Sequence, residues 1–510
     1  MRNLLFIVSL ALFSIAISSC REDFSTEITS GKLLFSKDTI FLDTVFTNIG
    51  SSTYTLKVYN KNSQAISIPS VKLGNGENSM YRLNIDGKAG KVFKDIEILG
   101  KDSLYIFIET TIDFTKTANP IYTDSIVFEG NNTVQDVKLV TLVKDAHFLF
   151  PNRNTQGVIE TITIDQNLHN ETYDIQGFYL ENNTVFKNDK PYVIYGYCVV
   201  PENKTLTIEA GAKLHFHSNS GLIISKGATL KIEGELEKPV TIEGDRLEYL
   251  YENIPGQWGF IWLQSGSKNN SMNNTIIKNA SIGILVDSNE LETSPTLTIH
   301  NSQIYNSSNY GILGRNTSIE GKNVVINNAG INSLACTFGG SYDFTHCTFT
   351  NFWNKSFRNT PSVVINNYAF IEKDEDFIKE TRDLNAANFT NCIIDGSNAL
   401  EFEVDKIEET IFNFSFTNNL LKFNDPYNYY SKNTLYNFLN SENYTNNIFN
   451  GKPHFKAPYT NDLIIGEESD AIEKGIESGT TKIPFDILGN IRSAKGDVGA
   501  YNHIIFETEK

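Results

Sequence analysis

The amino-acid sequence predicts an all-β protein organised around a parallel β-helix. Short runs with an apolar residue at alternate positions begin at residues 206, 214, 222 and 230, the first being Leu206-Thr-Ile208. Each run is typical of a strand with one buried face, and turn formers such as Gly211 and Gly227 separate the runs. Three such strands give a coil of about 24 residues, which buries its inner face only by stacking on the next coil. We therefore expect Leu206 to lie one rung below Leu230.

A meander of β-hairpins would share this alternation. Its short connections would carry Asn-Gly or Asp-Gly turns, and these connections lack them. The parallel β-helix is therefore the better interpretation.

The same pattern recurs downstream in a looser form. Repeats begin at residues 274, 301, 323, 346 and 391, in steps of 27, 22, 23 and 45, and the last step is expected to span about two coils. The sixth position of four repeats is asparagine, at Asn279, Asn306, Asn328 and Asn351. Stacked amides can hydrogen-bond to one another, and asparagine tolerates the left-handed backbone of a tight turn. An asparagine ladder with a structural role is predicted.

Five segments carry a resemblance to a known group of proteins. They are residues 189–196, 206–211, 244–248, 255–259 and 497–501, and they include Pro255-Gly-Gln-Trp-Gly259 and Asp497-Val-Gly-Ala-Tyr501. Together they resemble right-handed parallel β-helix surface lipoproteins of Bacteroidetes-type bacteria, over most of residues 150 to 505. The resemblance implies a fold and a cell-surface location but no reaction. Related β-helices include polysaccharide lyases and hydrolases.

The N-terminus is typical of a secreted, lipid-anchored protein. Arg2 precedes an apolar stretch over residues 4–17, which is too short for an ordinary membrane-spanning helix. Ile17-Ser-Ser-Cys20 resembles a bacterial lipobox, so Cys20 is the expected lipidation site and the lipid the contact with the membrane. The alternative is an ordinary cleaved signal with an incidental cysteine. Arg21-Glu-Asp23 is similar to the signal that exports such lipoproteins to the outer face of the bacterial outer membrane.

Residues 31–145 show short alternating runs that predict a small β-sandwich, for which we expect a spacer role. Phe46-Thr-Asn-Ile-Gly50 resembles an early strand of immunoglobulin-like domains. In the C-terminal part, Arg492 is expected to form a bidentate ion pair with Asp486 or Asp497 and so to act as a structural clamp. The predicted order is a signal peptide (1–19), a lipidated tether (20–30), the β-sandwich (31–145), a connector with an N-terminal cap (146–187), the β-helix (188–450) and a C-terminal cap (451–510).

Four cysteines follow Cys20 in the chain. Cys347 and Cys392 share a repeat position and are predicted to lie two rungs, or roughly 10 Å, apart, which is too far for a disulfide. They are expected to be stacked thiols of the core. A bond between Cys198 and Cys336 stays open.

Histidines offer few candidates for chemistry. His215 and His217 flank Phe216 and are expected to point outward, but no third ligand is evident, so no metal and no cofactor is expected. His346 opens a repeat and is interpreted as a hydrogen-bonded structural residue rather than a general base.

The candidate ligand site is the insertion at residues 244–258. Its aromatic side chains can present flat faces to sugar rings, while arginine and carboxylates can hydrogen-bond to hydroxyl groups. In the alternative interpretation the charged residues only staple the loop and the aromatic residues only cover the side of the β-helix. The ligand-binding candidates are Asp245, Arg246, Glu248, Tyr249, Tyr251 and Trp258.

The formal net charge of −17 over 510 residues argues against nucleic acid as a partner, because that affinity comes mainly from cationic side chains. A glycosidase needs two carboxylates across the scissile bond, and Asp245 with Glu248 or Glu252 could supply them, as could many other surface acids. The leading hypothesis is non-catalytic binding or scaffolding of a glycan or another extracellular polymer. The alternatives are a polysaccharide lyase or glycoside hydrolase, and an adhesin or structural stalk.

Overall fold

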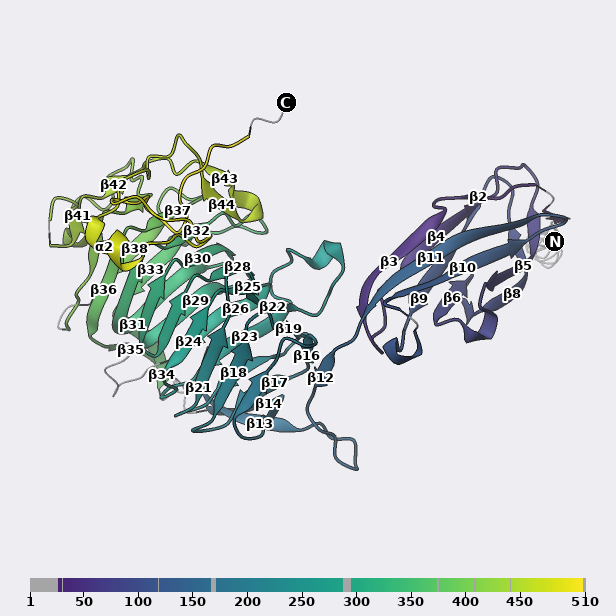
Figure 1. Ribbon diagram of the computed structural model, residues 1–510, viewed down its shortest axis with the longest axis horizontal. Helices are drawn as coiled ribbons and strands as arrows, with labels where there is room; N and C mark the ends of the chain where they lie inside the picture. Colours follow the sequence, from purple (N-terminus) through teal and green to yellow (C-terminus); the bar gives the residue numbers. More distant parts are fainter. Residues whose placement is uncertain are drawn as a thin grey trace, which may run out of the picture. The chain divides into compact units, whose positions relative to one another are not determined.

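A computed structural model of the chain describes residues 26–29, 31–117, 119–166, 171–287, 295–373, 376–407, 410–440 and 442–507. Its contacts divide the chain into two compact units, Met1–Asp145 and Ala146–Lys510, which run from purple to blue and from blue to yellow in Figure 1. The predicted signal peptide and Cys20 lie outside the described residues. Within the described residues, no helix is both long and apolar enough to cross a membrane.

The first unit is a β-sandwich, as predicted. One sheet has the order β1-β5-β10-β11-β3, with β8 on β5, and the other has the order β2-β4-β9-β6-β7. Alternate residues of both sheets meet in one core, for example Leu56 and Ile106 from one sheet with Val71 and Leu139 from the other. Its immunoglobulin-like character stays a prediction. The strands are β1 (Glu27–Ile28), β2 (Leu34–Phe35), β3 (Thr39–Phe46), β4 (Tyr54–Tyr59), β5 (Ile66–Leu73), β6 (Tyr81–Ile85), β7 (Lys88–Gly90), β8 (Val92–Ile98), β9 (Ser103–Thr110), β10 (Ile121–Glu129) and β11 (Val134–Lys144).

The sandwich begins earlier than the sequence predicted. Glu27–Ile28, which the sequence placed in the tether, pair with Ile66 and Ser67 of β5 as strand β1. This short segment therefore adds a strand to the sheet.

The second unit is a parallel β-helix, which confirms the predicted fold class. Its strands stack side by side in Figure 1, and Leu206 pairs with Leu230 on the next rung, as expected. The coils have three faces. Face 1 is the sheet formed by β12 (His147–Leu149), β16 (Tyr192–Ile194), β19 (Lys213–Phe216), β22 (Val240–Gly244), β25 (Thr275–Lys278), β28 (Gln303–Ser307), β30 (Val325–Ala329), β32 (Thr348–Asn351), β37 (Ile393–Gly396), β40 (Leu420–Leu421) and β42 (Ile448–Phe449).

Faces 2 and 3 share one long sheet, because β29 (Tyr310–Lys322) and β31 (Asn332–Thr345) bend around the corner between them. Face 2 consists of the first halves of β29 and β31 with β14 (Glu171–Tyr179), β17 (Tyr197–Val200), β20 (Gly221–Ile224), β23 (Trp258–Leu263), β26 (Ala280–Val286), β33 (Val363–Asn366) and β38 (Phe402–Asp405). Face 3 consists of the second halves with β15 (Thr184–Phe186), β18 (Thr205–Glu209), β21 (Thr229–Glu233), β24 (Asn270–Asn273), β27 (Leu297–His300), β36 (Leu384–Thr390), β39 (Ser415–Thr417) and β41 (Tyr444–Thr445).

The asparagine ladder forms over three of its four predicted rungs. Asn279, Asn306 and Asn328 all have left-handed backbones, with φ of 66°, 57° and 57°. Asn306 Nδ2 donates to Asn279 Oδ1 at 3.5 Å, and Asn328 Nδ2 donates to Asn306 Oδ1 at 3.4 Å. Asn351 departs from the pattern, because its amide donates to the carbonyl of Ala329 at 2.8 Å.

The 45-residue step is one coil and not two. Thr348 of β32 pairs directly with Ile393 of β37, and the additional residues include a hairpin of β34 (Tyr368–Lys373) and β35 (Asp376–Thr381). Cys347 and Cys392 therefore occupy neighbouring rungs, and the backbone N–H of Cys347 lies 3.4 Å from Cys392 Sγ. Both are free, buried thiols, as are Cys198 and Cys336. The described structure therefore contains neither a Cys347–Cys392 disulfide, which the sequence excluded, nor a Cys198–Cys336 disulfide, which the sequence left open.

The first coil lies within the predicted connector. Strands β12, β14 and β15 pair with β16, β17 and β18 of the next coil. Strand β13 (Thr161–Gln166) pairs with β14 as an antiparallel hairpin. Its Ile162 and Ile164 join Val199, Ile223 and Trp262 in a cluster that covers the outer side of face 2.

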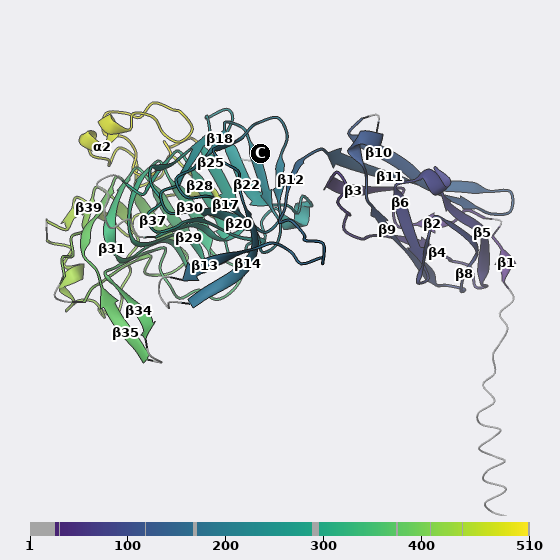
Figure 2. The ribbon, with the colours of Figure 1, turned by 90° about the horizontal axis from the view of Figure 1, so that it is seen from below.

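The C-terminal segment covers a side of the β-helix and not its open end. Leu463 and Tyr501 pack with Tyr305 and Val325 on the outer side of face 1. Figure 2 shows this segment, with α2 (Glu477–Lys482), along one flank of the coils. The segment also contains the antiparallel pair β43 (Phe455–Ala457) and β44 (Asp462–Ile465).

Aromatic residues between and around the last strands cover the final coil instead. Tyr436 and Tyr444 belong to the main core, and Tyr430, Phe438 and Phe449 pack against it. Residues 423–449, and not the predicted cap at 451–510, therefore cover the end of the β-helix.

Candidate functional site

The predicted ligand loop is stapled to itself. Arg246 Nη2 lies 2.8 Å from Glu248 Oε1, and the guanidinium lies 3.8 Å from the ring centroid of Tyr251. Asp245 Oδ2 lies 2.7 Å from Nδ1 of His217, which raises the pKa of that imidazole. These contacts are those of the stapling interpretation, and they occupy the charged groups that were expected to meet a ligand.

Trp258 does not belong to a binding surface. Its side chain is 1% exposed, its ring stacks on Phe216 with centroids 4.8 Å apart, and Nε1 donates to the carbonyl of Lys278 at 2.8 Å. Trp258 is the first residue of β23, and its side chain lies in the interior of the coil. Tyr249, at the tip of the loop, is 81% exposed.

His215 of β19 and His217, one residue beyond the strand, do not form an exposed pair, because His215 is covered. His215 is 3% exposed and its Nδ1 lies 3.2 Å from the carbonyl of Gly244, whereas His217 is exposed beyond the strand. In the part of the chain that the structure describes, no three His, Cys, Asp or Glu side chains gather as metal ligands.

His346 is a rung of a second left-handed ladder. The opening residues of the repeats, Asn301, Asn323, His346 and Asn391, have φ of 48°, 51°, 53° and 55°. His346 Nδ1 donates to the carbonyl of Gly499 at 3.3 Å, and Nε2 accepts from Asn391 Nδ2 at 2.9 Å. Burial and the nearby charge of Arg492 hold the pKa of His346 well below its ordinary value. The neutral imidazole of His346 thus makes hydrogen bonds at a ladder position that asparagine occupies on the neighbouring rungs. The signal was present in the sequence, since every repeat opens with Asn or His.

Arg492 acts as a clamp, but not through the predicted carboxylates. Its Nη2 donates to the carbonyls of Gly499 and Ala500, both at 3.1 Å, and to Asn323 Oδ1 at 2.9 Å. Asp497 binds His503 instead, with 2.7 Å between Oδ2 and Nδ1. Arg492 therefore holds the C-terminal segment to face 1.

Face 3 differs from the other two faces in its outer side chains. Faces 1 and 2 carry apolar outer residues beneath the C-terminal segment and the β13–β14 hairpin. On face 3 two columns of polar residues run in register from β18, one to β39 and the other to β41, the longer over about 40 Å at the usual strand spacing. One column is Thr207, Lys231, Ser271, Thr298, Glu320, Asp343, Asn388 and Ser415, and the other is Glu209, Glu233, Asn273, His300, Lys322, Thr345, Thr390, Thr417 and Thr445.

Sequence reasoning missed this surface. Its members come from single alternate positions of strands that are 22 or more residues apart. Aligning the repeats from β18 onward on their third strand shows a threonine or another polar residue at each outward position.

The middle of face 3 holds a charged cluster of four residues. Glu320 pairs in register with Asp343, and His300 with Lys322. The Lys322 ammonium contacts Glu320, and His300 Nε2 lies 3.5 Å from Glu320 Oε1. Lys322 lowers the pKa of Glu320, whereas burial and the Glu320 charge raise the pKa of Asp343. Burial and Lys322 lower the pKa of His300. Two carboxylates on adjacent rungs thus have different proton affinities.

Comparison with known proteins supports the β-helix. Residues 177–286 match the family of pectate-lyase-like beta-helix domains, so this part of the chain is similar to that class of fold. No curated protein matches the chain.

Two solved structures show only marginal likeness. One is a family 123 glycoside hydrolase from Clostridium perfringens, described in a study of glycolipid glycan hydrolysis, with 11% identity, a TM-score of 0.16, and coverage of 22% of this chain and 26% of that one. The other is a FixG-related protein from Vibrio parahaemolyticus, with 21% identity, a TM-score of 0.15, and coverage of 19% of this chain and 81% of that one. The chain spans about a quarter of the hydrolase, and neither likeness carries an argument.

Proposed function

We propose that this protein is a non-catalytic, lipid-anchored surface protein that binds an extracellular polysaccharide along face 3 of its β-helix. The observation that carries the proposal is the pair of polar columns over about 40 Å, on the face that no other described segment covers with an apolar cluster.

A linear polymer of sugars suits this surface. Hydroxyl, amide or charged side chains at each rung can hydrogen-bond to sugar hydroxyl groups. Their repetition along the helix axis matches a ligand that repeats along its own length. The net charge of −17 does not favour nucleic acid.

The proposal includes attachment to the bacterial outer membrane through a lipid on Cys20, with the protein facing outward as in Bacteroidetes-type surface lipoproteins. Protease treatment of intact cells tests this location. Digestion before lysis is expected, and protection until lysis would contradict surface exposure.

Affinity electrophoresis tests polysaccharide binding. The protein without residues 1–20 is run in gels containing xylan, mannan, β-glucan, alginate or polygalacturonate. Asn273→Ala and Asn388→Ala, on face 3, are each expected to weaken retardation roughly fivefold, because each removes hydrogen bonds to the polymer. Lys213→Ala, an exposed position on face 1, is the control. Equal retardation of all three variants would refute binding by face 3.

A second candidate, glycoside hydrolysis, rests on the Glu320–Asp343 pair. Partners on neighbouring strands lie about 4.8 Å apart, which is close to the carboxylate spacing of retaining glycosidases. The lowered pKa of Glu320 suits a nucleophile, and the raised pKa of Asp343 suits a general acid. The same polysaccharides are assayed for new reducing ends. Release that Glu320→Gln and Asp343→Asn both abolish would establish catalysis, and binding without release would leave the non-catalytic function.

A further inference from the structure

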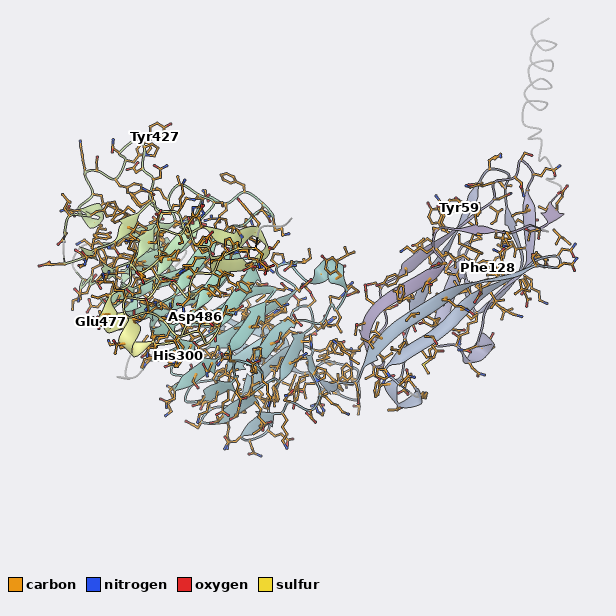
Figure 3. The ribbon with its side chains drawn as sticks, turned by 45° about the horizontal axis from the view of Figure 1, so that its top comes forward. Tyr59, Phe128, His300, Tyr427, Glu477 and Asp486 are labelled. Atoms are coloured by element: carbon orange, nitrogen blue, oxygen red, sulfur yellow. The ribbon has the colours of Figure 1, made fainter. Side chains whose placement is uncertain are left out.

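The β-sandwich, expected to be a plain spacer, exposes a row of apolar side chains on one of its sheets. The outer side of the β2-β4-β9-β6-β7 sheet carries Leu34, Tyr59, Tyr105 and Phe107, here called the aromatic strip. Leu34, Tyr105 and Phe107 are 46%, 47% and 43% exposed, and Tyr59 is partly exposed. Figure 3 labels Tyr59 on this unit together with Phe128, a core residue that is 1% exposed.

The strip is continuous across three strands. Leu34 of β2 pairs with Tyr59 of β4. Tyr105 of β9 pairs with Lys57, two residues from Tyr59, so the two tyrosines are diagonal neighbours. Phe107 follows on the same side of β9. The usual spacings along and between strands give a strip about 20 Å long.

Polar side chains border the rings. The Lys57 ammonium lies 4.8 Å from the ring centroid of Tyr105 and 5.5 Å from that of Tyr59, between the two rings. On the other side, Asn84 pairs in register with Phe107. The Tyr105 hydroxyl raises the pKa of Lys57, so the amine stays charged.

We propose that the aromatic strip is a second carbohydrate-binding site, which takes a short stretch of a polysaccharide chain. Flat rings in a row can stack on the apolar faces of successive sugars, while Lys57 and Asn84 reach their hydroxyl or carboxylate groups. The site lies in a different unit from face 3 and does not depend on the function proposed for the β-helix.

The size of the strip favours a glycan over a protein partner. Three side chains that are roughly half exposed, together with the partly exposed Tyr59, offer about 300 Å². A stable protein interface needs about 800 Å² on each partner. An oligosaccharide needs only a few stacked rings.

The test uses a double variant, Tyr105→Thr with Phe107→Thr, which keeps residues of high β-propensity in β9. Phe41→Thr is the matched control, because Phe41 of β3 is 67% exposed on the other sheet. Both are run in affinity gels with xylan, mannan, β-glucan and polygalacturonate, in the wild-type protein and in a background carrying Asn273→Ala and Asn388→Ala. The masses of all proteins are measured by light scattering.

The double variant is expected to lower affinity roughly tenfold or more in both backgrounds, with no change for Phe41→Thr. Unchanged affinity in the double variant would overturn the proposal and leave binding by face 3 untouched. Absence of retardation in all four gels would also overturn it. A wild-type dimer that the double variant converts to a monomer would overturn it in favour of contact between two copies.

Discussion

Arg358→Met removes one half of a buried ion pair that ties neighbouring coils together. The side chains of Arg358 and Glu401 are 2% and 0% exposed, and Nη2 lies 2.8 Å from Oε1. Glu401 also accepts hydrogen bonds from the backbone N–H of Ser362 at 2.8 Å and of Asn398 at 2.6 Å. Arg358 lies in the segment between β32 and β33, and Glu401 immediately precedes β38.

The expected cost follows from burial. Removing one partner leaves the other charge buried without compensation, which destabilises a protein by about 3–5 kcal/mol. We therefore expect Arg358→Met to lower the free energy of unfolding by about that amount at pH 7.5. Replacing both residues, with Arg358→Met and Glu401→Leu, leaves no buried charge and is expected to cost much less.

The pH dependence supplies a second test. Burial raises the pKa of Glu401 above its ordinary value, and loss of Arg358 raises that pKa further. A carboxyl group whose pKa is higher in the folded than in the unfolded state destabilises the fold as the pH rises above the unfolded pKa. The penalty in Arg358→Met is therefore expected to be smaller at pH 5 than at pH 7.5.

Urea unfolding followed by far-UV circular dichroism measures these differences. Lys456→Met is the control, because Lys456 and Asp462 form an exposed pair with side chains 52% and 31% exposed, and its loss should cost about 1 kcal/mol or less. A loss below about 1 kcal/mol in Arg358→Met, or a double variant as unstable as the single one, would refute the reasoning.

Further variants and a labelling experiment test the described contacts. His346→Asn should leave stability within about 1 kcal/mol, because asparagine occupies this ladder position on other rungs, whereas His346→Ala should cost about 2–4 kcal/mol in urea unfolding. Since the folded-state pKa of His346 is depressed, the wild type should lose stability as the pH falls below about 6.5, and His346→Asn should lose less between pH 7.5 and 5.5. Trp258→Ala should cost about 3–5 kcal/mol and Tyr249→Ala about 0.5 kcal/mol or less, in the same assay. Cys392→Ser should preserve the acceptor for the Cys347 amide, whereas Cys392→Ala should cost about 1–3 kcal/mol. A thiol reagent should modify the cysteines only after unfolding.

Much of the architecture was predictable because the strands and turns of a β-helix coil depend on residues that are close together in the sequence. Alternation defines which side chains face inward, and the turn residues define the coil length, so the pairing of Leu206 with Leu230 was accessible from the spacing alone. The asparagine ladder was accessible for the same reason, since the left-handed turn needs a particular residue type at a fixed repeat position.

The candidate sites were less accessible. In the loop at 244–258 the sequence showed the right chemistry but not its partners, and the structure pairs Arg246 with Glu248 and buries Trp258 against Phe216. The Glu320–Asp343 pair needs two strands from adjacent coils in register, and the aromatic strip needs β2, β4 and β9 to be neighbours in one sheet.

The sequence by itself determined that the chain is all-β, that its coils stack in parallel, and where several strands of the coils begin. Only the tertiary structure decided which sides of the coils are covered. The number of residues between two repeats does not show whether they contain a second coil or an insertion. The 45-residue step was therefore predicted to span two coils, whereas it is one coil. Val325 and Tyr501 belong to one apolar cluster although they lie far apart in the chain, and no local periodicity encodes this packing. The burial of faces 1 and 2, and the polar surface left on face 3, depend on such long-range packing.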